Sequence, residues 1–114
     1  MGEIQAVARS AEQRARNEST FREANEKLEE KVVEFDLTEE RTPYLCECDD
    51  LSCIAIIRLT IPEYEAVRSN PRQFVVTPEH DSLPDRVVEE HENFTVIQKT
   101  GEEGQLVEKE DPRA

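Results

Sequence analysis

Apolar residues recur every three or four positions from residue 3 to residue 34, a segment that contains neither glycine nor proline. This spacing places the apolar side chains on one face of an α-helix. Opposite charges four residues apart, as at Glu23 and Lys27, add support to a helix here. The apolar positions are Ile4, Ala8, Ala11 and Ala15 in the first half and Phe21, Ala24, Leu28, Val32 and Phe35 in the second. We therefore predict an N-terminal helical arm over residues 1–35.

The two halves of this arm differ in the apolar surface that they offer. Phe21, Leu28 and Val32 form the best-filled part of the stripe, and each would contribute about 1.5–3 kcal/mol if fully buried. The stripe breaks between Arg16 and Thr20, which allows a bend. In one interpretation the second half packs on the protein's own domain and the first half frays. In the other, the arm docks on a partner or on a second copy in a homodimer, with Phe21, Leu28 and Val32 as the partner-binding residues.

After a polar linker at residues 36–43, the pattern changes to short apolar runs. Residues 44–48 and 53–59 are rich in β-branched, aromatic or other apolar side chains and are separated by a four-residue polar turn, which predicts a β-hairpin. Thr60 and Glu63 have the spacing of a capping box, with a proline between them, and predict the start of a helix. We expect that helix to end before the Ser-Asn-Pro sequence that follows residue 68.

The next segments predict two more strands and one short helix. Residues 72–77 and 94–97 carry the apolar runs of strands, and a second capping pattern predicts a turn of helix over residues 82–88. From residue 101 onward the chain is acidic and contains two glycines, so we expect a solvated, disordered tail over residues 101–114. The predicted fold class is α+β, with a small domain at residues 44–100.

Composition restricts how this domain can be stabilised and what it can bind. Only 36% of the residues are apolar, 36% are charged, and the net charge is −13. A small domain of this composition needs a staple such as a metal ion. The acidic surface repels nucleic-acid phosphate and anionic lipid, which excludes direct duplex binding and favours a protein partner, in particular a basic one. With no apolar run of membrane-spanning length and no leader-like N-terminus, we expect a cytoplasmic protein.

The three cysteines of the chain lie within eight residues, at Cys46, Cys48 and Cys53. Cys46 and Cys48 are two apart on an expected strand and therefore share a face, and the hairpin brings Cys53 back towards them. Thiolates are preferred ligands of Zn²⁺, which takes four ligands at structural sites. We predict His80 as the fourth ligand, because it lies in a polar loop after the third strand, and keep His91 as the competing candidate.

Other interpretations of the cysteine cluster remain open. Cys48 and Cys53 have the spacing of a redox pair, and a redox sensor that releases zinc on oxidation is compatible with a metal site. A cysteine activated by His80 would indicate an enzyme, but the sequence shows no oxyanion-hole motif or third orienting group. The acidic residues around the cysteines are best explained as solvated turn formers and not as a calcium loop; these residues are Glu47, Asp49 and Asp50.

Several short motifs together resemble a group of small, mostly uncharacterised actinobacterial proteins. These motifs are Cys46-Glu47-Cys48 with Cys53, Glu63-Tyr64-Glu65-Ala66-Val67-Arg68, Asn70-Pro71-Arg72-Gln73-Phe74 and Pro78-Glu79-His80, with the preceding segment from Asn17 to Leu28. The resemblance implies a bacterial, cytosolic origin and Cys46, Cys48, Cys53 and His80 as the shared pattern, and it carries no activity with it. From the residues themselves we expect a non-enzymatic, zinc-binding adaptor or regulatory protein.

Overall fold

The computed structural model describes residues 10–37, 40–78 and 86–113. Its elements are α1 (Ala11–Glu34), β1 (Thr42–Leu45), β2 (Ile56–Leu59), α2 (Ile61–Arg68), β3 (Gln73–Val76), β4 (Arg86–Glu90), β5 (Thr95–Gln98) and α3 (Gly101–Lys109). The predicted α+β class is confirmed: a long N-terminal helix precedes small antiparallel sheets and two further helices. None of the described helices is long and apolar enough to cross a membrane.

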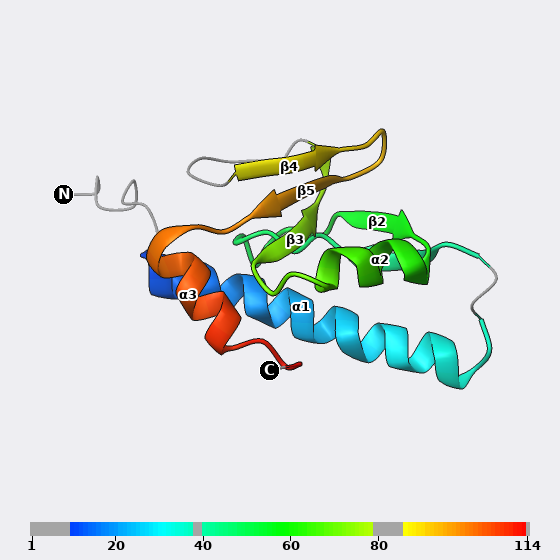
Figure 1. The fold of residues 1–114 in the computed structure, drawn as a ribbon. Coiled ribbons are helices and arrows are strands. Elements are labelled where there is room, and N and C mark those ends of the chain that lie inside the picture. Colours follow the sequence, from blue (N-terminus) through cyan, green and yellow to red (C-terminus); the bar gives the residue numbers. More distant parts are fainter. Residues whose placement is uncertain (1–9, 38–39, 79–85, 114) are drawn as a thin grey trace.

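Two small antiparallel sheets form the β part of the fold. β1 pairs with β2, with Leu45 opposite Ile56, and the second sheet has the order β3-β5-β4. Helix α1 runs along one side of the molecule beneath α2 and the strands, and α3 lies beside its N-terminal half (Figure 1). The capping box at Thr60 and Glu63 is present as predicted and starts α2. On α2, Tyr64 stacks on Tyr44 of β1 with the ring centroids 4.2 Å apart.

Helix α1 is part of the core. Ala15 and Val32 are buried, and Phe21 and Leu28 pack against the core cluster. This packing corresponds to the interpretation in which the second half of the arm covers the protein's own domain. The protein's own packing therefore covers Val32 and partly covers Phe21 and Leu28. The expected helix over residues 3–9 lies outside the described residues, and within them the N-cap is Ser10, whose hydroxyl accepts a hydrogen bond from the Gln13 N–H.

The prediction of a disordered tail over residues 101–114 was wrong for its described part. Helix α3 occupies Gly101–Lys109 and buries Val107 completely. The two glycines that suggested a solvated segment have structural roles. Gly101 starts the helix with a φ of +60°, and a Cβ at Gly104 would lie 2.8 Å from the carbonyl oxygen of Lys99. Because glycine alone fits this close approach, these residues favour docking of α3 and not disorder.

Two other expected boundaries also differ. The linker predicted at residues 36–43 already contains the start of β1 at Thr42. Residues 86–88, predicted as the end of a short helix, belong to strand β4, in which Val87 lies opposite Ile97 of β5. Pairing with β5 outweighs the helix signal, since β-branched pairs such as Val87-Val88 favour a strand when a partner edge is available. Residues 82–85 of that prediction lie outside the described part of the chain.

Buried ion pairs connect several elements in the interior of this protein, which has few apolar residues. Arg68, which is buried, binds the Asp111 carboxylate with two N–O distances of 3.2 and 2.6 Å and the Glu26 carboxylate at 2.6 Å. Arg22 lies over the ring of Phe74, 3.6 Å from its centroid, and donates to the carbonyl oxygen of Pro71. These bonds join α1, α2 and the segment after α3. Charged residues therefore make contacts between elements that apolar side chains make in most cores.

A second buried cluster joins α1 to α3 through Glu18, Lys99 and Glu103. Lys99 Nζ lies 2.6 Å from Glu18 Oε2 and 3.4 Å from Glu103 Oε2. Burial raises the pKa of Glu18 to about 9, and the neighbouring Glu103 carboxyl adds to the shift while Lys99 opposes it. Burial also disfavours ionisation of Glu103, but bonds from Glu18, Lys99 and Arg14 hold its pKa below the ordinary value. The two carboxyl groups therefore share one proton at neutral pH.

This cluster predicts a stability that falls as the pH rises. A carboxyl whose pKa is raised on folding stabilises fully below its unfolded pKa of about 4.5, and that contribution is lost as the pH rises towards about 9. We expect the Tm to fall by about 5 °C or more between pH 5 and pH 9. The variant Glu18→Gln, which keeps the neutral shape, should flatten this profile, whereas Glu30→Gln on the exposed face of α1 should not. A slope unchanged in Glu18→Gln would show that the shared proton has no role.

Candidate metal centre

The three cysteines lie in the loop that connects β1 to β2. Cys46 follows directly after β1, and its N–H donates to the carbonyl oxygen of Ala55 at 3.2 Å, which extends the hairpin by one pair. A turn closes the loop, with the Cys53 N–H donating to the Asp50 carbonyl oxygen at 3.0 Å. Asp50 also stabilises the turn through its side chain, which accepts from the N–H and the hydroxyl of Ser52. Local hydrogen bonds thus hold Cys46 and Cys53 on facing segments.

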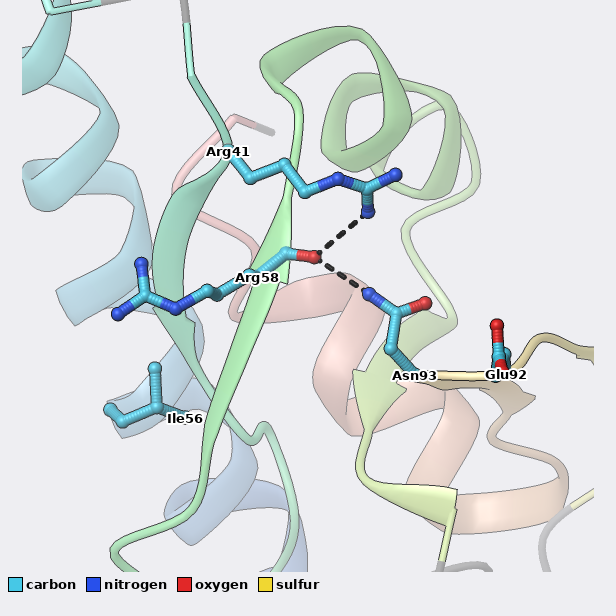
Figure 2. Close-up of a pocket in the computed structure, with 5 residues that line it drawn as sticks. All are labelled: Arg41, Ile56, Arg58, Glu92 and Asn93. Carbon is cyan, nitrogen blue, oxygen red and sulfur yellow. Dashed lines mark hydrogen bonds between the residues drawn. The ribbon is translucent and has the colours of Figure 1, made fainter.

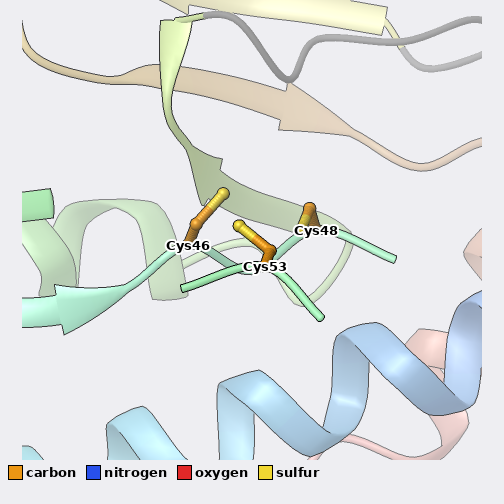
Figure 3. A group of neighbouring side chains, drawn as sticks. All are labelled: Cys46, Cys48 and Cys53. Carbon is orange, nitrogen blue, oxygen red and sulfur yellow. The ribbon is translucent and has the colours of Figure 1, made fainter. Parts of the chain in front are cut away.

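The three sulfur atoms gather at one point. All lie within 4.8 Å of one another, and Figure 3 shows the side chains of Cys46, Cys48 and Cys53 side by side. Cys46 and Cys48 are buried, with 1% and 6% of their surface exposed, and Cys53 is partly exposed. No disulfide joins them. The arrangement can hold a metal ion, as the spacing of the cysteines predicted.

Of the two predicted candidates for a fourth ligand, His91 lies within the described residues and His80 does not. His91 lies at the end of β4, where its Nε2 is 2.8 Å from Glu89 Oε1 and its ring stacks on Phe94, so the structure does not bring it into the cysteine group. His80 lies outside the described residues. The Thr77 N–H, however, donates to Cys46 Sγ at 3.4 Å, and His80 follows Thr77 by three positions.

Two of the thiols, those of Cys46 and Cys53, have pKa values raised above the ordinary value for cysteine. A hydrogen bond with Cys48 and burial both raise the pKa of Cys46, and burial raises the pKa of Cys53. Low-dielectric surroundings disfavour a thiolate that has no positive charge nearby. A divalent cation reverses this preference, because its charge stabilises the thiolates, and its binding releases protons.

Glu47, between the first two cysteines, is completely buried, so its interpretation as a solvated turn former was wrong. Its Oε2 accepts hydrogen bonds from the amide of Asn25 at 2.9 Å and from the hydroxyl of Tyr64 at 2.5 Å. Its Oε1 accepts from the Val75 N–H at 3.1 Å. Through these bonds one carboxylate ties the loop to α1, α2 and β3.

Helix α1 holds the cysteine loop through two asparagines that the sequence analysis did not single out. Asn17 donates to the carbonyl oxygen of Asp49 at 2.8 Å, and Asn25 both donates to and accepts from the backbone of Leu45. A signal was present in the sequence: Asn17 lies in the break of the apolar stripe. Helix α1 is continuous through this break, which is a polar contact site for the loop.

Comparison with known proteins adds no further constraint to this geometry. No protein-family model matches the chain, and neither the curated proteins nor the solved structures contain a match.

Proposed function

We propose that this chain is a non-enzymatic zinc-binding protein that acts as an adaptor or regulator through protein contacts. The observation that carries the proposal is the group of three sulfur atoms within 4.8 Å of one another. Thiolates that bind one zinc ion at about 2.3 Å in a tetrahedron lie about 3.8 Å apart. The sulfurs therefore need to close by no more than about 1 Å to bind the ion together, and a set of three thiolates favours zinc over hard cations.

The surroundings of the cysteines support a structural role for the ion. The Thr77 N–H donates a hydrogen bond to Cys46 Sγ. Such a bond to a ligand sulfur fixes its orientation and reduces its negative charge. On the opposite side of the loop, Glu47 and the two asparagines of α1 fix its backbone to the core. An ion held at this point would close the β1–β2 loop on itself and, through His80, would tie it to the segment after β3, which is the kind of support that the composition requires. His80 remains the proposed fourth ligand.

A redox function is the second candidate, and the partial exposure of Cys53 favours it. An oxidant such as hydrogen peroxide would convert the thiols of Cys48 and Cys53 into a disulfide. The sulfurs would give up two electrons and two protons, and the peroxide would become two water molecules. Loss of two ligands would release zinc and loosen the loop, so the same site would act as a sensor.

We expect the purified, reduced protein to carry one zinc ion per chain, because three thiolates and His80 complete the tetrahedron. Native mass spectrometry reads the bound metal, disulfides and oligomeric state together. Cys53→Ser should lose the ion and destabilise the domain by several kcal/mol, whereas Ser52→Ala in the same turn should keep it. Less than stoichiometric zinc after metal-replete expression would refute the proposal. Zinc loss with a Cys48–Cys53 disulfide after peroxide treatment would support the redox function.

A further inference from the structure

The outward face of the β1–β2 sheet carries apolar residues where a solvated sheet carries polar ones. Along β2 the exposed positions alternate with buried ones, and the exposed row is Ile54, Ile56 and Arg58. Ile54 is 88% exposed and Ile56 is 50% exposed. Isoleucine at such positions loses favourable burial in the isolated chain and is typical of a surface that another molecule covers.

Strand β1 continues this face. Leu45, half-buried, lies opposite Ile56, and Pro43, exposed, lies opposite Arg58. Residues directly opposite in an antiparallel pair share a face of the sheet. The apolar row of β2 therefore widens into a two-stranded surface, which we call the hairpin face and define by Pro43, Leu45, Ile54, Ile56 and Arg58.

A hollow with a volume of about 560 Å³ borders the hairpin face and is lined by Arg41, Ile56, Arg58, Glu92 and Asn93. In Figure 2 the side chains of Arg41 and Asn93 converge on the carbonyl oxygen of Arg58, and those of Ile56 and Arg58 leave the strand on the same side. The N–O distances are 3.3 Å from Arg41 and 2.8 Å from Asn93. Because two side chains already occupy this carbonyl, a partner would lie across the face and would not extend the sheet as a further strand.

The charge on this face is opposite to that of the whole protein. Among the residues described, Arg58 forms no ion pair with a carboxylate, although the chain has 27 acidic and 14 basic residues. Arg41 is half-exposed and lies 3.7 Å from Glu63. With Arg41 paired to Glu63, the charge on the hairpin face itself is that of Arg58 alone, a positive charge in a chain whose net charge is −13. A partner that covers the isoleucines gains most if it places a carboxylate next to Arg58.

We propose that the hairpin face binds an acidic, amphipathic segment of a partner protein. This inference rests on the proposed adaptor function and supplies its docking site. A second copy of the chain fits the face less well, because a two-fold contact would bring the arginines of both copies together and join two bodies of charge −13. The basic partner expected from the overall charge would bind elsewhere on the acidic surface.

The probe is a fluorescein-labelled peptide of 12 residues that alternates glutamate and leucine, titrated with the zinc-loaded protein and followed by fluorescence anisotropy. We expect saturable binding that weakens about tenfold in Arg58→Glu and in Ile54→Asp, because each removes one half of the proposed recognition. Arg16→Glu changes the net charge equally but lies on the exposed face of α1, and Val33→Asp removes an exposed apolar residue of α1. Both controls should bind the peptide as the unaltered protein does.

Absence of binding, or equal affinity in all four variants, would overturn the inference. A homodimer in sedimentation velocity that Ile54→Asp dissociates would assign the face to a second copy and overturn it as well. Native mass spectrometry of the same samples separates this result from the proposed function. Lost peptide binding with full zinc content refutes only the docking site, whereas a lack of zinc counts against the metal centre.

Discussion

Replacing Glu47 with alanine should destabilise the protein by about 3–5 kcal/mol, a large part of the 5–15 kcal/mol that holds a typical domain folded. The carboxylate is fully buried and accepts hydrogen bonds from Asn25, Tyr64 and the Val75 N–H. Alanine would leave the Tyr64 hydroxyl and the Val75 N–H without this acceptor and the Asn25 amide with only the Leu45 carbonyl, and Arg22 would lose a nearby negative charge. Urea denaturation followed by circular dichroism measures the change as a lower midpoint at constant m value.

The matched control for this variant is Glu30→Ala, which removes an exposed glutamate from α1 and should change stability by less than about 0.5 kcal/mol. Glu47→Gln keeps the size of the side chain but turns an amide towards groups that donate, so it should fall between the two. Zinc content should be measured in parallel, since a displaced loop also weakens the cysteine site. A Glu47→Ala protein as stable as the unaltered chain would show that the carboxylate does not tie the loop to the core.

A chain that ends at Thr100 should fail to fold. It lacks α3 and with it the buried side chain of Val107, which contributes about 1.5–3 kcal/mol. It also lacks Asp111, the bidentate partner of Arg68, and removing one member of a buried ion pair costs about 3–5 kcal/mol. The sum of about 4.5–8 kcal/mol reaches the lower part of the 5–15 kcal/mol that holds a typical domain folded, and a small domain with few apolar residues lies in that part of the range. Circular dichroism and the dispersion of an amide NMR spectrum would report the loss.

Removal of residues 112–114 alone is the control for this truncation. It deletes Arg113, whose ion pairs with Glu26 and Glu65 are partly exposed and contribute little. We expect this shorter protein to fold and to unfold within about 1 kcal/mol of the full chain. A folded, cooperative protein that ends at Thr100 would instead mean that α3 is a dispensable addition, as the composition of this segment first indicated.

The metal site was the part of the molecule most open to prediction from sequence. Cys46 and Cys48 were expected to share a face of one strand, and the structure instead ends β1 at Leu45 and places both in the loop, where a turn closed by Asp50 returns the chain to Cys53. The three sulfurs still meet, because all three cysteines lie within eight residues of one short loop. The predicted fourth ligand, His80, belongs to a segment distant in sequence, and local rules do not determine where such a segment packs. Proximity of Thr77 to Cys46 supports His80 as a ligand, and the position remains a prediction.

The sequence by itself determined the elements whose signals are local. The spacing of apolar residues gave α1 its register, the capping box fixed the start of α2, and the β-branched runs produced β2, β3 and β5. In each case hydrogen bonds and side-chain contacts between near neighbours decide the conformation, so a pattern within about 15 residues carries the information. The α+β class follows from the order of these elements.

Only the tertiary structure determined which polar residues are buried and which are exposed. From the sequence, Glu47 was interpreted as a solvated turn residue and residues 101–109 as part of a tail. In the structure, residues distant in sequence donate three hydrogen bonds to Glu47 and bury Val107. A buried charge is costly by itself and becomes favourable only when every partner is in place. Periodicity cannot reveal such partners, because they come from other helices and strands. In a chain with few apolar residues, an acidic segment therefore folds only where other helices and strands supply partners for its buried charges.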